Sequence, residues 1–215
     1  MITTKFEDRA DWLDARRGRI TGSRLKNLIV KRGSEMKKGY YEIIAERLSV
    51  PEDPELPMDR GTRLESEAIA LFVEETGKKI NTDLVIWERD DNSRIAVSPD
   101  GFTEDEAEAV VIGSIGTREA VEVKCLNSAD HIKAFITKEI PDDYDDQVIQ
   151  YFTVNEKLER LYFVMYDPRM SVHSFFYLVI ERADVEEKVK TYLAQQQNML
   201  ATIEATIIKL TGNLF

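Results

Sequence analysis

The chain predicts an α+β fold in which helices flank a central mixed β-sheet. Helical patterns come first along the chain, strand-like runs follow in the middle, and a long amphipathic pattern closes it. Its 215 residues fit one domain with a substantial core, and its hydrophobic content of 43% is ordinary for a globular protein. Repeats and low-complexity linkers are missing from the sequence. We therefore predict a single domain over residues 1–215.

Four helices are predicted in the N-terminal part, at residues 12–20, 24–30, 36–48 and 60–76. Ser23 precedes the second helix, and its hydroxyl suits an N-cap. The fourth helix carries Leu64, Ala68 and Leu71 on one face and stops at Gly77, a residue typical of helix C-termini. These patterns indicate amphipathic helices that pack on a core.

The rest of the chain predicts a sheet interrupted by helices. Strand-like runs rich in β-branched and aromatic residues lie at residues 84–87, 94–97, 110–112, 120–125, 161–166 and 175–180. Helical patterns lie at residues 128–137, 144–155 and 184–210. A Pro-Asp-Gly turn follows the second strand-like run. This order favours a mixed sheet.

The composition limits where the protein is expected to be and which metal sites it can have. No apolar run approaches the roughly 20 residues that span a bilayer, and the N-terminus lacks a signal-peptide pattern, so we expect a cytoplasmic protein without membrane contact. The single cysteine, Cys125, excludes an intramolecular disulfide and a cysteine-based zinc cluster. With only two histidines, a bound metal would be held by oxygen, which favours Mg²⁺ or Mn²⁺.

The charge is distributed unevenly. The net charge is −11, yet residues 16–38 hold nine basic side chains and one acidic one, which leaves +8 there and −19 elsewhere. A basic phosphate track on an otherwise acidic protein has this distribution. Two solvated helices rich in lysine and arginine would have it too, and composition leaves both interpretations open.

The most informative pattern combines Asp100, Glu122 and Lys124. Asp100 lies in Ser-Pro-Asp-Gly after a strand-like run, and Glu122 and Lys124 lie two residues apart in another, so their side chains share one face of that strand. Two neighbouring carboxylates repel each other unless a divalent cation binds them, and Mg²⁺ prefers such oxygens together with water and phosphate. The pattern suits metal-assisted phosphodiester hydrolysis. A Glu-x-Lys pair on a half-exposed strand is also common as a solvated face.

Six segments in order resemble the phage lambda exonuclease family, the YqaJ-type viral recombinases of the PD-(D/E)xK nuclease superfamily. The matching segments are residues 12–23 (W-x₃-R-x-G-x-I-T-G-S), 61–68 (G-x₃-E-x₂-A), 98–101 (SPDG), 122–125 (EVKC), 147–151 (the glutamine helix) and 166–170 (YDPRM). The resemblance covers most of the chain and implies a restriction-endonuclease-like PD-(D/E)xK core. One departure is the long stretch 102–119 between the Asp and Glu-x-Lys segments, which the family usually spans with a short hairpin.

The resemblance also implies the catalytic residues. Asp100 and Glu122 would bind metal together with the Val123 backbone carbonyl, and Glu65 would help to bind a second ion. Two Mg²⁺ ions per site are expected, with Mn²⁺ as a substitute. Lys124 would position or deprotonate the attacking water, and Gln147 would orient substrate or water.

Other implied roles concern DNA. Arg16 and Ser23 are the candidates for binding a terminal 5′-phosphate, since a guanidinium and a helix N-terminus both suit that group. Met58 is a possible wedge between the two strands, although a core methionine fits as well. Tyr151 is assigned to the core.

The function implied is a Mg²⁺-dependent 5′→3′ exonuclease on linear double-stranded DNA, which releases mononucleotides and leaves a 3′ single strand. The resemblance further implies a homotrimeric ring, a single-strand annealing protein as partner, and a phage or prophage enzyme in the bacterial cytosol. Two alternatives stay open at this point. They are a structure-specific or restriction-type PD-(D/E)xK endonuclease, and an inactive subunit of a recombination complex.

Overall fold

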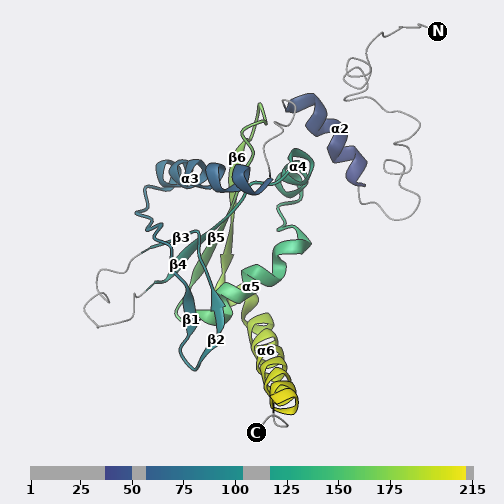
Figure 1. The fold of residues 1–215 in the computed structure, drawn as a ribbon. Coiled ribbons are helices and arrows are strands. Elements are labelled where there is room, and N and C mark those ends of the chain that lie inside the picture. The colour runs from purple at the N-terminus through teal and green to yellow at the C-terminus, as the bar shows by residue number, and fades with distance from the viewer. Residues whose placement is uncertain (1–36, 50–56, 104–116, 212–215) are drawn as a thin grey trace, which may run out of the picture. The chain divides into compact units, whose positions relative to one another are not determined.

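The computed structural model describes residues 37–49, 57–103 and 117–211 (Figure 1). The elements in chain order are α2 (Lys38–Leu48), α3 (Pro57–Thr76), β1 (Trp87–Arg89), β2 (Asn92–Val97), β3 (Gly101–Phe102), β4 (Glu119–Lys124), α4 (Ser128–Thr137), the 3₁₀ helix η2 (Asp142–Tyr144), α5 (Asp145–Val154), β5 (Arg160–Tyr166), β6 (Phe175–Glu181) and α6 (Arg182–Thr211). The α+β fold class is confirmed.

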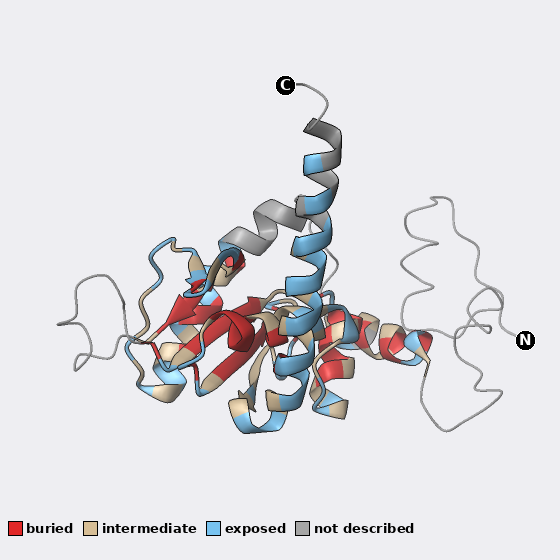
Figure 2. Ribbon diagram, turned by 90° about the horizontal axis from the view of Figure 1, so that it is seen from below, coloured by how far each residue is buried: buried red, intermediate tan, exposed pale blue. Residues whose placement is uncertain are grey.

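The strands form two sheets. The larger sheet has the order β3-β4-β5-β6, and β1 and β2 form a separate antiparallel pair (Figure 1). Buried residues follow β3, β4 and β5 of the larger sheet, whereas β6 is mostly of intermediate exposure and α6 is largely exposed (Figure 2). Both β4 and β5 have consecutive buried residues instead of alternating ones, which is the pattern of strands covered on both faces.

The predicted strand at residues 84–87 is wrong except for its last residue. Strand β1 begins at Trp87, and Leu84 and Ile86 before it are exposed at 102% and 71%. Apolar side chains therefore do not mark a buried strand here. The short strand β3 was not predicted, because two residues carry no periodicity. The predicted helices at residues 12–20 and 24–30 and the predicted strand at 110–112 lie outside the described residues.

Contacts divide the chain into two compact units. The first unit comprises Met1–Ala68, Lys124–Glu139 and Val164–Phe176, and the second comprises Ile69–Val123, Ile140–Phe163 and Tyr177–Phe215. The prediction of a single domain stays a prediction. In the first unit, helices α2 and α4 pack together through a cluster formed by Tyr41, Ala45, Ala129, Ile132 and Met170.

Helix α5 is the centre of the second unit. Its buried residues include Ile149 and Phe152, and it packs against β1, β2 and α6. Two arginines donate to backbone carbonyls at its C-terminal end: Arg89 to Thr153, and Arg182 to Phe152. Cations are favourable at a helix C-terminus, where carbonyl groups lack partners within the helix. This anchoring fixes the helix that carries Gln147.

Among the described residues, no helix combines the length and the apolar character needed to cross a membrane.

Candidate active site

The pairing of β3 with β4 brings Asp100 close to the Glu122–Val123 segment. The two strands are antiparallel, with Gly101 opposite Val121 and Phe102 opposite Ala120. Asp100 directly precedes β3, in a bend. The side chain of Asp100 in addition accepts a hydrogen bond of 2.7 Å from the Val123 backbone amide.

This arrangement differs in one respect from what the sequence predicts. Strand β2, which precedes the Pro-Asp-Gly turn, pairs with β1 and is not part of the larger sheet. The two residues of β3 provide the pairing with β4 instead. Gly101 suits this position, because a Cβ there would lie 2.6 Å from the Ile80 side chain.

The long stretch between Asp100 and Glu122 begins after residues of β3 and β4 that are still paired. The backbone amide of Thr103 donates to the Glu119 carbonyl at 3.0 Å, in the same register as the rest of β3 and β4. Residues 104–116 between them lie outside the described residues. The extra length therefore begins beyond the pairs that bring the two carboxylates close together.

Glu122 is a buried carboxylate, with an exposed fraction of 1%. A solvated strand face, the alternative interpretation of its sequence pattern, is therefore wrong for this residue. Its oxygens accept hydrogen bonds from two residues of α5: the Gln147 side-chain amide donates to one oxygen at 2.7 Å, and the Tyr151 hydroxyl donates to the other. Hydrogen bonds of this kind offset the cost of burying a polar side chain.

Tyr151 lies between the two carboxylates. Burial raises the pKa of Tyr151 above its ordinary value of 10.0, and the nearby charges of Glu122 and Asp100 raise it further. The phenol therefore stays protonated at neutral pH and acts as a hydrogen-bond donor. Asp100 and Glu122 both lie in the second unit, where Asp100 accepts from the Val123 amide next to Glu122.

Lys124 is the last residue of β4 and is partly buried. The chain then turns into α4, where the Asn127 side chain caps the helix by accepting from the Asp130 backbone amide at 3.0 Å. Ser128 donates to Asp167 at 2.5 Å, and Arg169 pairs with the same carboxylate and reaches the Leu126 carbonyl. These contacts hold the segment that follows Lys124 in the first unit.

The remaining predicted residues are less completely described. Glu65 lies in α3, in the first unit, with intermediate exposure, so its role in metal binding stays a prediction. Glu67, two residues along, accepts a hydrogen bond from the Tyr166 hydroxyl at 3.1 Å. Met58 lies in the first turn of α3, and Arg16 and Ser23 lie outside the described residues.

The donor atoms fit a hard divalent cation. Asp100 and Glu122 supply carboxylate oxygens from adjacent strands, and Val123 between Glu122 and Lys124 supplies a backbone carbonyl. Mg²⁺ needs only one or two carboxylates when water and phosphate oxygens complete its shell. No group of three or more His, Cys, Asp or Glu side chains within the described residues is arranged to hold a metal. Asp100 and Glu122 are thus the predicted metal ligands that the structure brings close together.

Sequence reasoning missed Tyr151. It was assigned to the core, and it is indeed fully buried, yet its hydroxyl contacts Glu122. The available signal was its spacing from Gln147, because residues four apart lie on the same face of a helix. A second missed feature is the Asp167–Arg169 pair, which sequence indicates only as a turn.

Comparisons with known proteins identify a family and similar structures. The profile of the YqaJ-like viral recombinase domain matches residues 11–157. A crystal structure of an alkaline exonuclease, LHK-Exo from Laribacter hongkongensis, has a TM-score of 0.53 and 26% sequence identity, and the match covers 94% of this chain and 99% of that one. LHK-Exo in complex with dAMP gives the same TM-score and coverage at 27% identity. No curated protein matches the chain.

Proposed function

We propose, from the premise that the chain belongs to the YqaJ-like viral recombinase family, that it is a Mg²⁺-dependent 5′→3′ exonuclease on linear double-stranded DNA. The likeness to an alkaline exonuclease supports a DNA exonuclease in general. The observation that carries the proposal is the buried Glu122 carboxylate, brought close to Asp100 by strand pairing and held by Gln147.

Asp100, Glu122 and the Val123 carbonyl would hold the metal, and Glu65 would contribute to a second ion. When bound, two divalent cations stabilise the charge on the attacking and leaving oxygens of an in-line displacement. The protein's own contribution is geometric. Strand pairing sets the separation of the carboxylates, and the hydrogen bond from Val123 to Asp100 orients the second one.

Lys124 and Gln147 act on the attacking water. Lys124 follows Val123 directly and ends β4, so its ammonium or amine group positions the water or takes its proton. Gln147 has two amide hydrogens, of which one is used by Glu122, and the other is proposed to orient a water or a phosphate oxygen.

The remaining proposed roles explain dependence on a DNA end. Arg16 and Ser23 bind the 5′-phosphate that each cut leaves, and Met58 separates the terminal base pair. The product is a 3′ single strand, which an annealing protein takes up in phage-type recombination in the bacterial cytosol. Residues 16–38, with their net charge of +8, supply the electrostatic attraction for the DNA backbone.

The test combines a variant with a choice of DNA substrate. Wild-type protein with Mg²⁺ should release mononucleotides from 5′-phosphorylated linear duplex and should not cut closed circular duplex. Lys124→Ala should reduce release from linear DNA by at least 10²-fold, because general acid–base catalysis is worth about 10²–10⁴-fold. It should still bind the duplex in a gel-shift assay.

Lys190→Ala is the matched control, since Lys190 is an exposed lysine of α6 paired with Glu187. It should keep wild-type turnover. Unchanged nucleotide release by Lys124→Ala would contradict the catalytic assignment. Cleavage of closed circles would replace the exonuclease with an endonuclease.

A further inference from the structure

The Tyr151 hydroxyl has contacts that packing alone does not require. It donates to the Glu122 carboxylate, and it also lies 3.4 Å from the Ser98 carbonyl. One phenol therefore contacts the side chain of one candidate metal ligand and the main chain that leads to the other.

Helix α5 holds Glu122 from both sides of the carboxylate. Gln147 and Tyr151 lie one helical turn apart, and each donates to a different oxygen of Glu122. Two donors at two oxygens fix both the position and the rotation of the carboxylate plane. The lone pairs that remain on each oxygen then point in set directions.

The ring of Tyr151 is itself held rigidly. Its side chain has an exposed fraction of 0%, and its ring meets that of Trp87 edge to face at a centroid distance of 6.2 Å. Moving the ring so that its oxygen left Glu122 would require a cavity that close-packed interiors do not offer. The packed ring therefore holds the hydroxyl in one position relative to the turn around Asp100.

We propose that Tyr151 is a positioning residue of the nuclease site, whose hydroxyl fixes the Glu122 carboxylate relative to Asp100 for binding of the catalytic cation. The inference rests on the proposed function and adds a residue to it. Groups that hydrogen-bond to metal ligands typically change metal affinity or activity by about 10–100-fold when they are removed. Tyr151 does not touch the substrate in this assignment; it acts through Glu122.

Tyr151→Phe tests the inference, because it removes the hydroxyl and keeps the ring against Trp87. Mn²⁺ affinity, measured by calorimetry without DNA, should fall about tenfold. The Mn²⁺ concentration that gives half-maximal nuclease rate should rise by a similar factor. At saturating Mn²⁺ most of the rate should return, a recovery that a general loss of structure would not produce.

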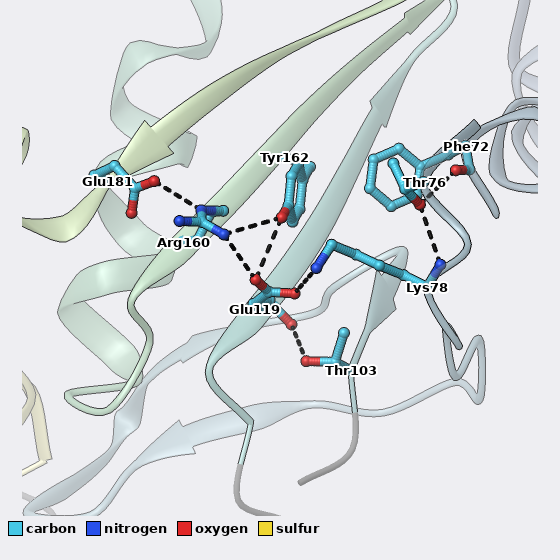
Figure 3. Close-up of polar contacts among 8 residues, drawn as sticks. All are labelled: Phe72, Thr76, Lys78, Thr103, Glu119, Arg160, Tyr162 and Glu181. Atoms are coloured by element: carbon cyan, nitrogen blue, oxygen red, sulfur yellow. Dashed lines mark hydrogen bonds and ion pairs between the residues drawn. The ribbon is translucent and has the colours of Figure 1, made fainter.

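Tyr162→Phe is the matched control. Tyr162 is also a buried tyrosine of the second unit, and its hydroxyl donates to Glu119 at 3.3 Å, in a cluster with Lys78, Arg160 and Glu181 (Figure 3). Tyr162→Phe also removes a tyrosine hydroxyl that donates to a carboxylate, but that carboxylate, Glu119, lies outside the site. It should keep wild-type Mn²⁺ affinity and nuclease rate.

The outcomes separate this inference from the function on which it rests. Wild-type protein that binds Mn²⁺ but leaves linear DNA intact would contradict the exonuclease, and the affinity of Tyr151→Phe would still decide the role of Tyr151. Equal Mn²⁺ affinity in wild type and Tyr151→Phe would overturn the positioning role. So would a Tyr151→Phe protein that fails to fold, because the hydroxyl would then be a determinant of the fold.

Discussion

Glu122 and Asp167 are both buried carboxylates, and their partners give them different roles. The donors to Glu122 described above are the neutral groups of Gln147 and Tyr151, which orient a carboxylate without cancelling its charge. Asp167 instead pairs with Arg169, whose guanidinium donates to both of its oxygens. The second arrangement neutralises a buried charge to hold a turn.

Asp167→Asn should lower the free energy of unfolding by about 3–5 kcal/mol at pH 7, because it leaves Arg169 buried without its counter-charge. The difference should depend on pH. Burial alone would raise the pKa of Asp167, but hydrogen bonds from Arg169 and Ser128 outweigh it and hold the pKa below the ordinary value of 3.8. The carboxylate thus contributes its full stability above pH 3.8 and loses it as the pH falls through the lower folded value.

Chemical denaturation of wild type and Asp167→Asn at neutral and acidic pH measures this difference. Asp145→Asn is the control, since Asp145 forms an exposed pair with Lys188 and its loss should change stability by less than about 1 kcal/mol. A gap between wild type and Asp167→Asn that stays constant below pH 3.8 would contradict the ion-pair role.

At the scale of elements, α5 links the fold to the site. One face of this helix carries the two donors to Glu122, and Gln150 reaches the Ala96 carbonyl of β2 at 3.1 Å. The C-terminal end of α5 is anchored by Arg182, the first residue of α6, which donates to the carbonyls of Phe152, Leu158 and Asn155. The orientation of the donors therefore depends on a contact outside the site.

Arg182→Ala should lower the free energy of unfolding by about 1.5–3 kcal/mol, since it removes charge-assisted hydrogen bonds to carbonyls that have no partner within the helix. Denaturant titration followed by circular dichroism measures the loss. Lys188→Ala, which removes another α6 cation that contacts α5, should cost less than about 1 kcal/mol because its pair with Asp145 is exposed. Equal losses in the two variants would mean that the anchoring of α5 adds no stability.

At the scale of the whole molecule, the charge distribution is the feature that bears on assembly. Residues 16–38 carry +8 while the rest of the chain carries −19. In a ring with the basic segments around its central channel, the positive charge would retain DNA inside the channel. The acidic remainder of each chain would repel DNA from the outer surface. The homotrimer implied by the family resemblance stays a prediction.

If the protein is a homotrimer, we expect its molar mass in solution to be three times the 24.7 kDa of the chain. Size-exclusion chromatography with light scattering measures it, at two protein concentrations to detect dissociation. Processive digestion should accompany the assembled form, because a ring stays on its DNA between cuts. A monomeric protein that digests long duplex without dissociating would contradict the ring.

Local patterns predicted most of the elements. Helices α3, α4 and α5 and strands β4 and β5 occur where periodicity placed them, to within a few residues at their ends. Periodicity succeeds there because each segment is long enough to repeat its pattern against a core. It fails for β3, which is two residues long, and for the apolar residues 84–86, which are not in a strand.

The sequence by itself determined which chemistry is available. One cysteine and two histidines leave oxygen as the metal donor, and the segments around Asp100, Glu122 and Lys124 resemble those of a nuclease family. Only the tertiary structure decided how these groups meet: β3 brings Asp100 close to Glu122, and Tyr151 donates to the buried carboxylate. The physical reason is that periodicity reports which way a side chain faces along its own element. Its partner across 20 or 30 residues of chain is chosen by strand register and packing.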